Sequence, residues 1–427
     1  MAEELAAVVM AGGLGTRMKS AIPKHLHPLL GRRVVDWVID AARGAGVERL
    51  VVVVSPATRE LFDGVEVAVQ EQPLGTGDAV RSARTALDGF DGDVLVLNGD
   101  VPALTRDTLE ALVATHRSER AAATVLSFEP ADPRAYGRVV RDGDGRLARI
   151  VEAGDASPDE LAVAEVNSGI YLFRAETLWP ALERLQAHNA QGELYVTDTV
   201  GLLVDDGEPC SVHVAADPFE VEGINTRVEL AAAAAALRDR INERHMLAGV
   251  TIVDPGSTWI EAGVEIEPDV TVHPFTVIRT DVRIATRAEI GPFAYVRPGT
   301  EIGAGAKIGT FVEMKKATIG AGAKVPHLSY IGDAEIGEGT NVAAGNITAN
   351  FKHESGAPKE RTRIGRNVRT GVDNVFDAPV EIGDDAWIAP GAVITDDVPA
   401  GSLAGFAPRQ VTKEGWVYEK HGRPHGD

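Results

Sequence analysis

The stretch IEPDVTVHPFTVIRTDVRIATRAEIGPFAYV, residues 266–296, decides the fold of the second half, because an aliphatic residue returns at every sixth position. The interval runs without interruption through Ile260, Ile266, Val272, Ile278, Ile284, Ile290, Val296, Ile302 and Ile308. It resumes at Ile319, Val325 and Ile331, and again at Ile364, Thr370, Phe376, Ile382, Ile388 and Ile394. A period of six fits neither an α-helix nor an amphipathic strand, and it is typical of a hexapeptide β-helix. We expect one aliphatic side chain of each hexad to point into a three-sided prism.

The period does not set the hand of the coil. The main alternative is a right-handed solenoid with longer coils, which would not keep a six-residue register over so many repeats. A left-handed coil departs from the usual right-handed crossover between parallel strands, so its hand is inferred from the repeat class alone. We therefore expect a left-handed parallel β-helix over residues 248–427, with a C-terminal tail.

Residues 1–226 follow a different pattern. The apolar runs LAAVVM (5–10) and RLVVVVS (49–55) alternate with helical stretches such as VVDWVIDAARGAG (34–46). Continuous Val and Leu runs are typical of strands buried on both faces of a mainly parallel sheet. We expect a Rossmann-like α/β domain here. An alanine-rich helical arm over 227–247 would connect it to the β-helix.

A glycine-rich loop, MAGGLGTRM (10–18), follows the first apolar run. Its glycine spacing fails the dinucleotide-binding fingerprint, and Gly15-Thr16-Arg17 replaces the end of a Walker loop. Such glycines still let backbone N–H groups approach an anion, although an ordinary tight turn is the other interpretation. The segment NGD (98–100) also follows a strand, and parallel strands end at one edge of a sheet. We expect the loop and this segment to be neighbours.

Length and composition restrict the class of protein. A chain of 427 residues is too long for one ordinary core, so several domains are expected. Cys210 is the single cysteine, which excludes an internal disulfide and a multi-cysteine zinc site. The net charge of −21 disfavours binding to nucleic acid or to anionic membranes. The start MAEEL lacks a basic signal region and no apolar run is long enough to span a bilayer, so we expect a cytoplasmic protein with small-molecule partners.

The order of further motifs resembles a known family. The first half contains, in the order seen in sugar-1-phosphate nucleotidyltransferases, AGGLGTRMKSAIPKHLH, QPLGTGDA, NGDVP, YGRVV, IVEAGD, EVNSGIY, ELYVTD and EGINTR. The second half contains FVEMKKATIG, HLSYIGDAEIG and NITANF, which are similar to the bacterial bifunctional N-acetylglucosamine-1-phosphate uridyltransferase/glucosamine-1-phosphate acetyltransferases. The resemblance covers nearly the whole chain. It implies a homotrimeric enzyme that uses Mg²⁺, UTP, acetyl-CoA, glucosamine-1-phosphate and N-acetylglucosamine-1-phosphate.

For the first half, the resemblance implies a uridyltransferase site in which Arg17 and Lys24 are catalytic cations. The positions that match nucleotide contacts are Ala11, Gly12, Gly13, Gly15, Lys24, Gln70, Gly75, Thr76, Asn98, Gly99 and Asp100. Those that match sugar contacts are Gly137, Glu152, Asn167, Thr197 and Asn225. Asp100 and Asn225 match the magnesium ligands, and Mg²⁺ prefers oxygen donors. Taken alone, an aspartate after a strand is as readily a helix N-cap.

For the second half, the resemblance implies that His327 takes a proton from the glucosamine amine, a role that a neutral imidazole can fill. A lone histidine is more often structural, and cations on a coil edge are more often solvated. The matches to the sugar-phosphate site are Arg297, Lys315, Tyr330, Asn341, Asn350 and Phe351. The matches to the acetyl-CoA site, expected in a groove between two chains, are Ala344, Val372, Pro390 and Ala407.

The chain departs from the family at three of these positions. Phe351 replaces a usual tyrosine, Val372 a common serine and Ala407 a frequent arginine, which removes donors from the acetyl-CoA site. Arg409 is a candidate to replace the lost guanidinium, and FKHESGAPKERTR (351–363) is a candidate flap over the cofactor. Two alternatives remain open: a monofunctional nucleotidyltransferase with a trimerising β-helix, and a catalytically silent trimeric scaffold.

Overall fold

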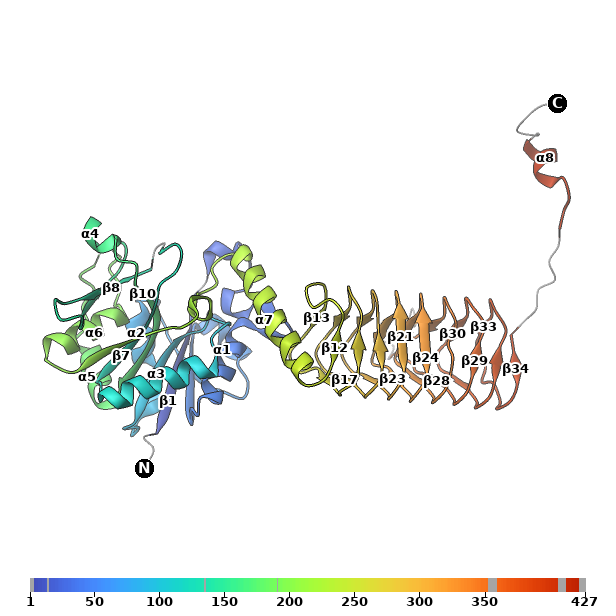
Figure 1. The fold of residues 1–427 in the computed structure, drawn as a ribbon, viewed down its shortest axis with the longest axis horizontal. Coiled ribbons are helices and arrows are strands. Elements are labelled where there is room, and N and C mark those ends of the chain that lie inside the picture. Colours follow the sequence, from blue (N-terminus) through green and yellow to red (C-terminus); the bar gives the residue numbers. More distant parts are fainter. Residues whose placement is uncertain are drawn as a thin grey trace. The chain divides into compact units, whose positions relative to one another are not determined.

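The computed structural model describes residues 4–13, 15–133, 136–189, 191–351, 359–405 and 412–421 (Figure 1). The chain divides into two compact units, 1–237 and 238–427, whose boundary lies within helix α7 (Arg227–Leu247). This helix occupies the residues expected to form a helical arm. Among the described residues, no helix is long and apolar enough to cross a membrane.

The core of the first unit is one sheet in the order β11-β7-β10-β6-β1-β4-β5. Its strands are β1 (Leu5–Ala11), β4 (Arg49–Val54), β5 (Glu66–Val69), β6 (Asp93–Asn98), β7 (Ala123–Phe128), β10 (Val166–Arg174) and β11 (Cys210–Val214). All pairs are parallel except those made by β10, which lies antiparallel between β6 and β7. The smaller strands are β2 (Pro28–Leu29), β3 (Arg32–Arg33), β8 (Arg138–Arg141) and β9 (Leu147–Val151). The expectation of a mainly parallel α/β domain is confirmed.

Helices cover both faces of this sheet. They are α1 (Val34–Gly44), α2 (Thr76–Ser82), α3 (Arg106–Glu119), α4 (Pro158–Leu161), α5 (Ala175–Glu183) and α6 (Val196–Asp205). Val9 and its neighbours on one face pack against α1 and α3, whereas Val8 and its neighbours pack against α2, α5 and α6. Since successive side chains of a strand point to opposite faces, both sides of these strands must be apolar. This packing explains the unbroken Val and Leu runs.

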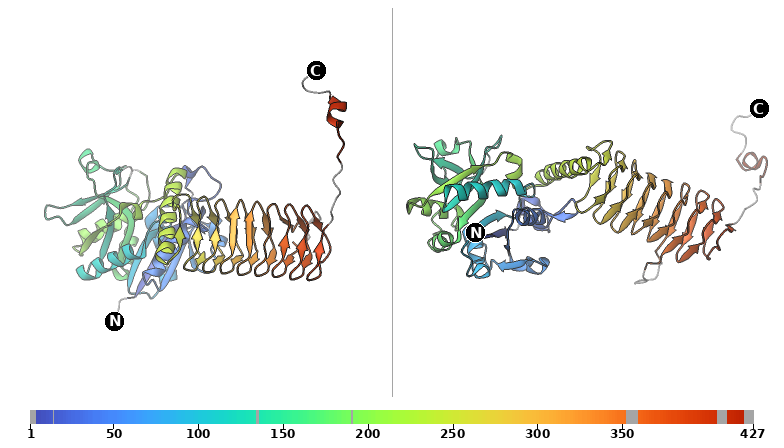
Figure 2. Two further views of the ribbon diagram at one scale, coloured as in Figure 1. Left: turned by 45° about the vertical axis from the view of Figure 1, so that its right-hand side comes forward. Right: turned by 60° about the horizontal axis from the view of Figure 1, so that its bottom comes forward.

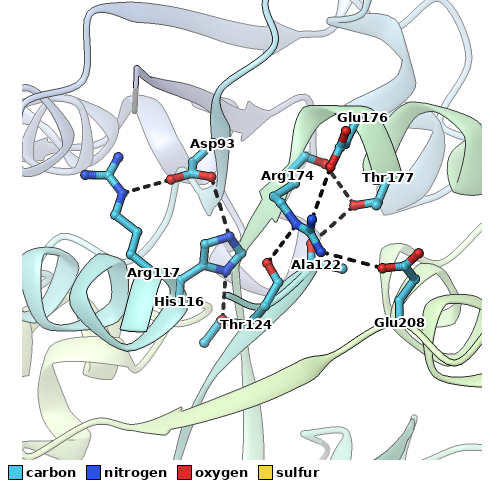
Figure 3. Close-up of polar contacts among 10 residues, drawn as sticks. Asp93, His116, Arg117, Ala122, Thr124, Arg174, Glu176, Thr177 and Glu208 are labelled. Atoms are coloured by element: carbon cyan, nitrogen blue, oxygen red, sulfur yellow. Dashed lines mark hydrogen bonds and ion pairs between the residues drawn. The ribbon is translucent and has the colours of Figure 1, made fainter. Parts of the chain in front are cut away.

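A buried polar cluster anchors the amino-terminal end of β6, opposite the end that carries Asn98 (Figure 3). Arg117 Nε donates to Asp93 Oδ2 at 3.0 Å, and His116 Nε2 lies 3.5 Å from Asp93 Oδ1. His116 Nδ1 shares a hydrogen bond of 2.8 Å with Thr124 Oγ1. Burial alone would raise the pKa of Asp93, but the hydrogen bonds from His116 and Arg117 hold it below its usual value. The carboxylate therefore fixes α3 to the base of the sheet.

The second unit is a left-handed parallel β-helix whose three faces are stacks of short strands (Figure 2). The β12 face contains β12 (Thr251–Ile252), β15 (Thr271–Val272), β18 (Glu289–Ile290), β21 (Lys307–Thr310) and β24 (Lys324–His327). A bridge at Asn341 continues this face to β29 (Arg369–Thr370), β32 (Trp387–Ile388) and β34 (Leu403–Ala404).

The other two faces follow the same arrangement. The β13 face contains β13 (Trp259–Ile260), β16 (Val277–Ile278), β19 (Tyr295–Val296), β22 (Glu313–Lys315), β25 (Tyr330–Gly332), β27 (Ile347–Ala349), β30 (Val375–Asp377) and β33 (Val393–Ile394). The β14 face contains β14 (Glu265–Ile266), β17 (Val282–Ile284), β20 (Thr300–Ile302), β23 (Thr318–Ile319), β26 (Ala334–Ile336), β28 (Thr362–Ile364) and β31 (Val380–Ile382). A short helix, α8 (Trp416–His421), lies in the C-terminal tail.

The six-residue register is confirmed as the inward face of the coils. Ile260, Ile278, Ile290 and Ile308 are fully buried, whereas Ile266, near the start of the β-helix, is only half-buried. Thr370, the polar residue in the register, is also buried. Each hexad forms one face of a coil and points one side chain toward the axis of the β-helix. Because the coils stack on this axis, these side chains together fill the interior.

The outward sides of the faces differ in chemistry. The β14 face carries ion pairs along the stack, for example Arg283 with Glu265 at 3.2 Å and with Glu301 at 3.5 Å. The β13 face instead points Val277, Tyr295, Ile347 and Val393 outward in some of its coils. A charged face is suited to solvent, whereas an apolar face is suited to a protein contact.

An aromatic ladder follows the corner between the β12 and β13 faces. We define the corner ladder as Phe275, Phe293, Phe311 and Leu328, whose side chains are between 45% and 60% exposed. The ring centroids lie 4.8 Å apart from Phe275 to Phe293 and 5.2 Å apart from Phe293 to Phe311. All four residues have φ between 48° and 59°, a left-handed backbone that bulky side chains rarely adopt. The fold therefore holds a row of apolar side chains outward at this corner.

Candidate active sites

The glycine loop follows β1, as expected, and comes close to Lys24. Gly15 has a φ of 64°, and a Cβ atom there would lie 2.7 Å from Lys24 Cβ. A side chain at this position would therefore displace Lys24, which is a reason for glycine in this loop. Leu14 lies outside the described residues. The loop continues into a 3₁₀ helix over Thr16–Met18, which carries Arg17.

Lys24 joins the two residues that the sequence analysis expects to bind a metal. Its Nζ atom contacts Asp100 Oδ2 and donates to Asn225 Oδ1 at 3.0 Å, while Arg17 Nη2 donates to the same oxygen at 2.8 Å. The backbone supports this arrangement, because Ile224 N donates to Asp100 O at 2.9 Å. The structure therefore brings Asp100 and Asn225, which are far apart in the sequence, together with Arg17 and Lys24.

These contacts fit a divalent cation. The carboxylate of Asp100 and the amide oxygen of Asn225 both contact one positively charged group, the Lys24 ammonium. Among the described residues, no group of three or more His, Cys, Asp or Glu side chains could hold a metal. Mg²⁺ requires no such group, because it keeps several waters and takes oxygens from substrate phosphates.

Two adjoining cavities lie beside this cluster. One, of about 280 Å³, is lined by Ala11, Gly12, Gly13, Lys24, Gln70, Gly75, Thr76, Asn98, Gly99 and Asp100, among others. The other, of about 520 Å³, is lined by Gly15, Arg17 and Asn225 and shares Gly12, Gly13, Lys24 and Gln70 with the first. Cavities of this size suit small molecules. The positions matched to nucleotide contacts therefore line one connected region.

Close packing fixes the backbone around Gly75 and Thr76. Gly75 has a φ of 121°, and a Cβ atom there would lie 2.4 Å from the carbonyl oxygen of Leu194. Thr76 Oγ1 accepts a hydrogen bond of 3.0 Å from the backbone N–H of Val196, at the start of α6. The side chain of Thr76 thus binds the first residue of α6 and ties this helix to the Gly75–Thr76 backbone.

Four of the five residues matched to the sugar also converge, whereas the fifth, Asn225, lies in the Lys24 cluster. Asn167 N donates to Gly137 O at 2.8 Å, and Thr197 Oγ1 donates to Glu152 Oε1 at 3.3 Å. A Cβ atom on Gly137 would lie 3.4 Å from Glu152 Oε2. Burial raises the pKa of Glu152, and the nearby charges of Asp198 and Asp155 act in the same direction.

His25 is a residue that the sequence analysis missed. It lines the smaller cavity beside Lys24, is 2% exposed, and its ring centroid lies 6.3 Å from that of Phe62. Burial lowers the pKa of His25 to about 4, so the imidazole is neutral at neutral pH. Its position directly after Lys24 was the available signal.

In the second unit, His327 and the residues matched to acetyl-CoA occupy equivalent positions of successive coils. His327, Ala344, Val372 and Pro390 each precede a residue with positive φ at the corner between the β12 and β13 faces. The coils are joined there by backbone hydrogen bonds of 2.8 Å from Asp373 N to Ala344 O and from Gly391 N to Val372 O. The His327 side chain is exposed, and none of the described residues bonds its ring. The residues form a column with an accessible imidazole.

The residues matched to the sugar phosphate lie mainly on the β13 face. Arg297 Nη1 donates to Glu313 Oε1 at 2.7 Å, and Asn350 Nδ2 lies 3.5 Å from the Tyr330 hydroxyl. Lys359, which the sequence analysis did not single out, adjoins Lys315. Contact with the Lys359 ammonium lowers the pKa of Lys315 below its usual value, and Arg297 acts in the same direction. The clustered positive charges of Arg297, Lys315 and Lys359 are suited to binding an anion.

Not every expected residue joins that group. Asn341 lies on the β12 face, where it bridges Lys324 and Arg369. Phe351 is 67% exposed. Ala407, Arg409 and residues 352–358 of the expected flap lie outside the described residues.

The comparisons with known proteins cover both units. The MobA-like NTP transferase domain matches residues 7–200. A protein of Corynebacterium efficiens named "Bifunctional protein GlmU" is 45% identical, over 97% of this chain and 94% of its own length. Proteins of the same name from Pelobacter propionicus and Geobacter sulfurreducens are 45% and 44% identical, over 97% and 98% of this chain and 98% and 99% of their own lengths.

Proposed function

Because the chain belongs to the family of bifunctional GlmU proteins, we propose that it catalyses two steps of UDP-N-acetylglucosamine synthesis. The second unit acetylates glucosamine-1-phosphate with acetyl-CoA, and the first unit joins the product to UMP from UTP, with release of pyrophosphate. The observation that carries the proposal is the convergence of Arg17, Lys24, Asp100 and Asn225 beside two cavities lined by the glycine loop. The net charge of −21 favours small-molecule partners over nucleic acid and membranes, and a cytoplasmic location is part of the proposal.

In the first unit, a phosphate oxygen of the sugar attacks the α-phosphorus of UTP. A new P–O bond forms as the bond to the β-phosphate oxygen breaks and pyrophosphate leaves. Arg17 and Lys24 reduce the repulsion between the two anions. Asp100 and Asn225 would hold the divalent cation, which we propose to be Mg²⁺ and which supplies further charge neutralisation when bound.

The sugar is oriented by the cluster of Gly137, Glu152, Asn167 and Thr197. Thr197 holds one carboxylate oxygen of Glu152, and the other oxygen lies beside Gly137. A carboxylate accepts hydrogen bonds from sugar hydroxyl or amide N–H groups. We assign this cluster to the N-acetylglucosamine moiety.

In the second unit, His327 takes a proton from the amine of glucosamine-1-phosphate. The amine nitrogen forms a bond to the thioester carbonyl carbon, and the C–S bond breaks to release CoA. The cations Arg297, Lys315 and Lys359 are suited to the phosphate of the sugar. The column of Ala344, Val372 and Pro390 continues from His327 along the corner and is the proposed path of acetyl-CoA.

This second site is proposed to be completed by a neighbouring copy in a homotrimer. Asn341 lies on the β12 face and Lys315 lies on the β13 face. Within one chain, these two residues are therefore on different sides of the β-helix. The exposed corner ladder and the outward Ile347 and Val393 of the β13 face supply apolar surface that a second copy would cover. The charged β14 face would remain in solvent.

The alternative of a monofunctional nucleotidyltransferase has one specific support. Val372 and Ala407 lack the polar groups that the family usually places at the acetyl-CoA site. The exposed His327 and the cation group beside Lys315 support two activities instead.

The test is one incubation of the full chain with glucosamine-1-phosphate, acetyl-CoA, UTP and Mg²⁺. Free CoA and pyrophosphate are followed together. Release of both, with pyrophosphate formation dependent on prior acetylation, is the expected result. Pyrophosphate release from N-acetylglucosamine-1-phosphate without any CoA release would favour the monofunctional alternative.

A further inference from the structure

The orientation of the Gln70 side chain is set by two acceptors on its nitrogen. Gln70 Nε2 donates to the Gly75 carbonyl oxygen at 3.0 Å and to Asp78 Oδ2 at 3.0 Å. A carbonyl and a carboxylate accept hydrogen bonds and donate none. The amide nitrogen must therefore face them, and both of its N–H groups are in use. The positions of the amide nitrogen and oxygen follow from these partners.

Arg81 keeps Asp78 in place for this contact. Arg81 Nη2 donates to Asp78 Oδ1 at 2.7 Å, which leaves Oδ2 for Gln70. The pair spans one turn of α2, and the Asp78 side chain is 13% exposed. Pairing with a guanidinium fixes the orientation of a carboxylate, so Oδ2 stays directed at Gln70 as an acceptor.

The Gln70 oxygen consequently faces the nucleotide cavity as an acceptor. Gln70 is 9% exposed and lines both cavities. Its Oε1 atom lies beside the glycine loop, 3.2 Å from where a Cβ atom on Gly12 would lie. Among the described residues, none donates a hydrogen bond to Oε1, so a ligand can supply the donor.

We propose that Asp78 is a positioning residue that makes the site select uracil over cytosine by fixing the amide of Gln70. Uracil carries an N–H at ring position 3, which can donate to Oε1. Cytosine carries an unprotonated nitrogen at this position, whose lone pair would face the Gln70 oxygen. A buried acceptor opposite an acceptor is unfavourable, and polar sites of this kind discriminate strongly. The inference rests on the proposed uridyl transfer and adds a role for Asp78 and its partner Arg81.

The test compares UTP with CTP as the nucleotide donor for N-acetylglucosamine-1-phosphate. The quantity measured is the ratio of kcat/KM for UTP to that for CTP. In Asp78→Asn, the new amide N–H can donate to Oε1 of a rotated Gln70, so the Gly75 carbonyl is the one remaining group that holds the original orientation. We expect the ratio to fall by at least about tenfold. In Asp78→Glu, which keeps the acceptor, the ratio should stay within about twofold of the original.

Two further variants serve as a substitute for Asp78→Asn and as a control for the loss of charge. Asp78→Ala removes the acceptor without adding a donor and should lower the ratio by about threefold, so it carries the test if Asp78→Asn does not fold. Asp88→Asn removes the same charge from an exposed position on the same segment and should leave the ratio unchanged.

The outcomes separate this inference from the proposed function. An unchanged UTP:CTP ratio in folded Asp78→Asn or Asp78→Ala would overturn the role of Asp78. A wild-type chain that turns over neither nucleotide would instead contradict the proposed uridyl transfer. A purely structural role of Asp78 would reduce the rates with UTP and CTP by the same factor.

Discussion

The two candidate sites differ in how far one chain completes them. In the first unit, hydrogen bonds and an ion pair join Arg17, Lys24, Asp100 and Asn225, and their neighbours line two adjoining cavities. In the second unit, His327 is exposed on a corner and its expected partners are divided between two faces. An α/β sheet gathers loops at one edge, whereas a β-helix distributes side chains along flat outer faces. We therefore propose that one site acts within a single chain and that the other is completed by a second copy.

The largest expected effect comes from Asp100, the residue of the first site that is proposed to bind the metal. Asp100→Ala removes a carboxylate that lines the smaller cavity and leaves the charge of Lys24 unbalanced. Pyrophosphate release should fall about a thousandfold, because such electrostatic groups contribute most to this chemistry. CoA release should stay within about twofold of the wild type.

The control is Asp91→Ala, which removes an exposed carboxylate near the start of β6. Its uridyl transfer should be unchanged. Full uridyl transfer by Asp100→Ala would remove the metal assignment.

The second site is tested by replacing its proposed general base, His327. His327→Ala should lower CoA release about a hundredfold, the contribution typical of a general base, and leave uridyl transfer unchanged. His273→Ala removes an imidazole elsewhere on the β12 face and is the matched control. Equal loss of both activities in His327→Ala would show that the sites are not independent.

Local patterns predicted the fold better than they predicted the sites. The hexads specify the β-helix because each repeat uses the same short-range arrangement, and Ile278 and Ile290 are buried as expected. The Val runs of β1 and β4 predicted the α/β sheet for a similar reason. The hand of the coil needed the repeat class, since nothing in the six-residue period gives a physical reason for a left-handed crossover.

The contacts within the sites depend on folding over long distances. The resemblance predicted Asp100 and Asn225, but the bridge made by Lys24 appears only when three loops meet. Asp78 lies within QPLGTGDA (72–79) and Lys359 within FKHESGAPKERTR (351–363), but nothing in either motif singles these two residues out. Their significance comes from Lys315 and Gln70, which they meet in the folded chain.

The smallest expected effect concerns acetyl-CoA. Val372 lies on the corner column, is 45% exposed and replaces a polar residue common in the family. Val372→Ser adds a hydroxyl group and should lower the KM for acetyl-CoA about fivefold, in line with one added hydrogen bond. Uridyl transfer should not change. The control is Val253→Ser, at another exposed valine of the β-helix. An unchanged KM in Val372→Ser would indicate that the cofactor does not follow this column.

The proposed difference between the two sites is tested most directly by dissociating the trimer into single chains. The double variant Phe293→Glu and Phe311→Glu places like charges on the corner ladder, and its molar mass in solution is measured alongside both activities. Leu61→Glu, at an exposed leucine of the first unit, is the control. We predict a monomer that releases pyrophosphate at the wild-type rate and loses at least about 99% of CoA release, as expected for an incomplete site. A monomer that acetylates at the wild-type rate, or a trimer that survives both substitutions, would contradict the account.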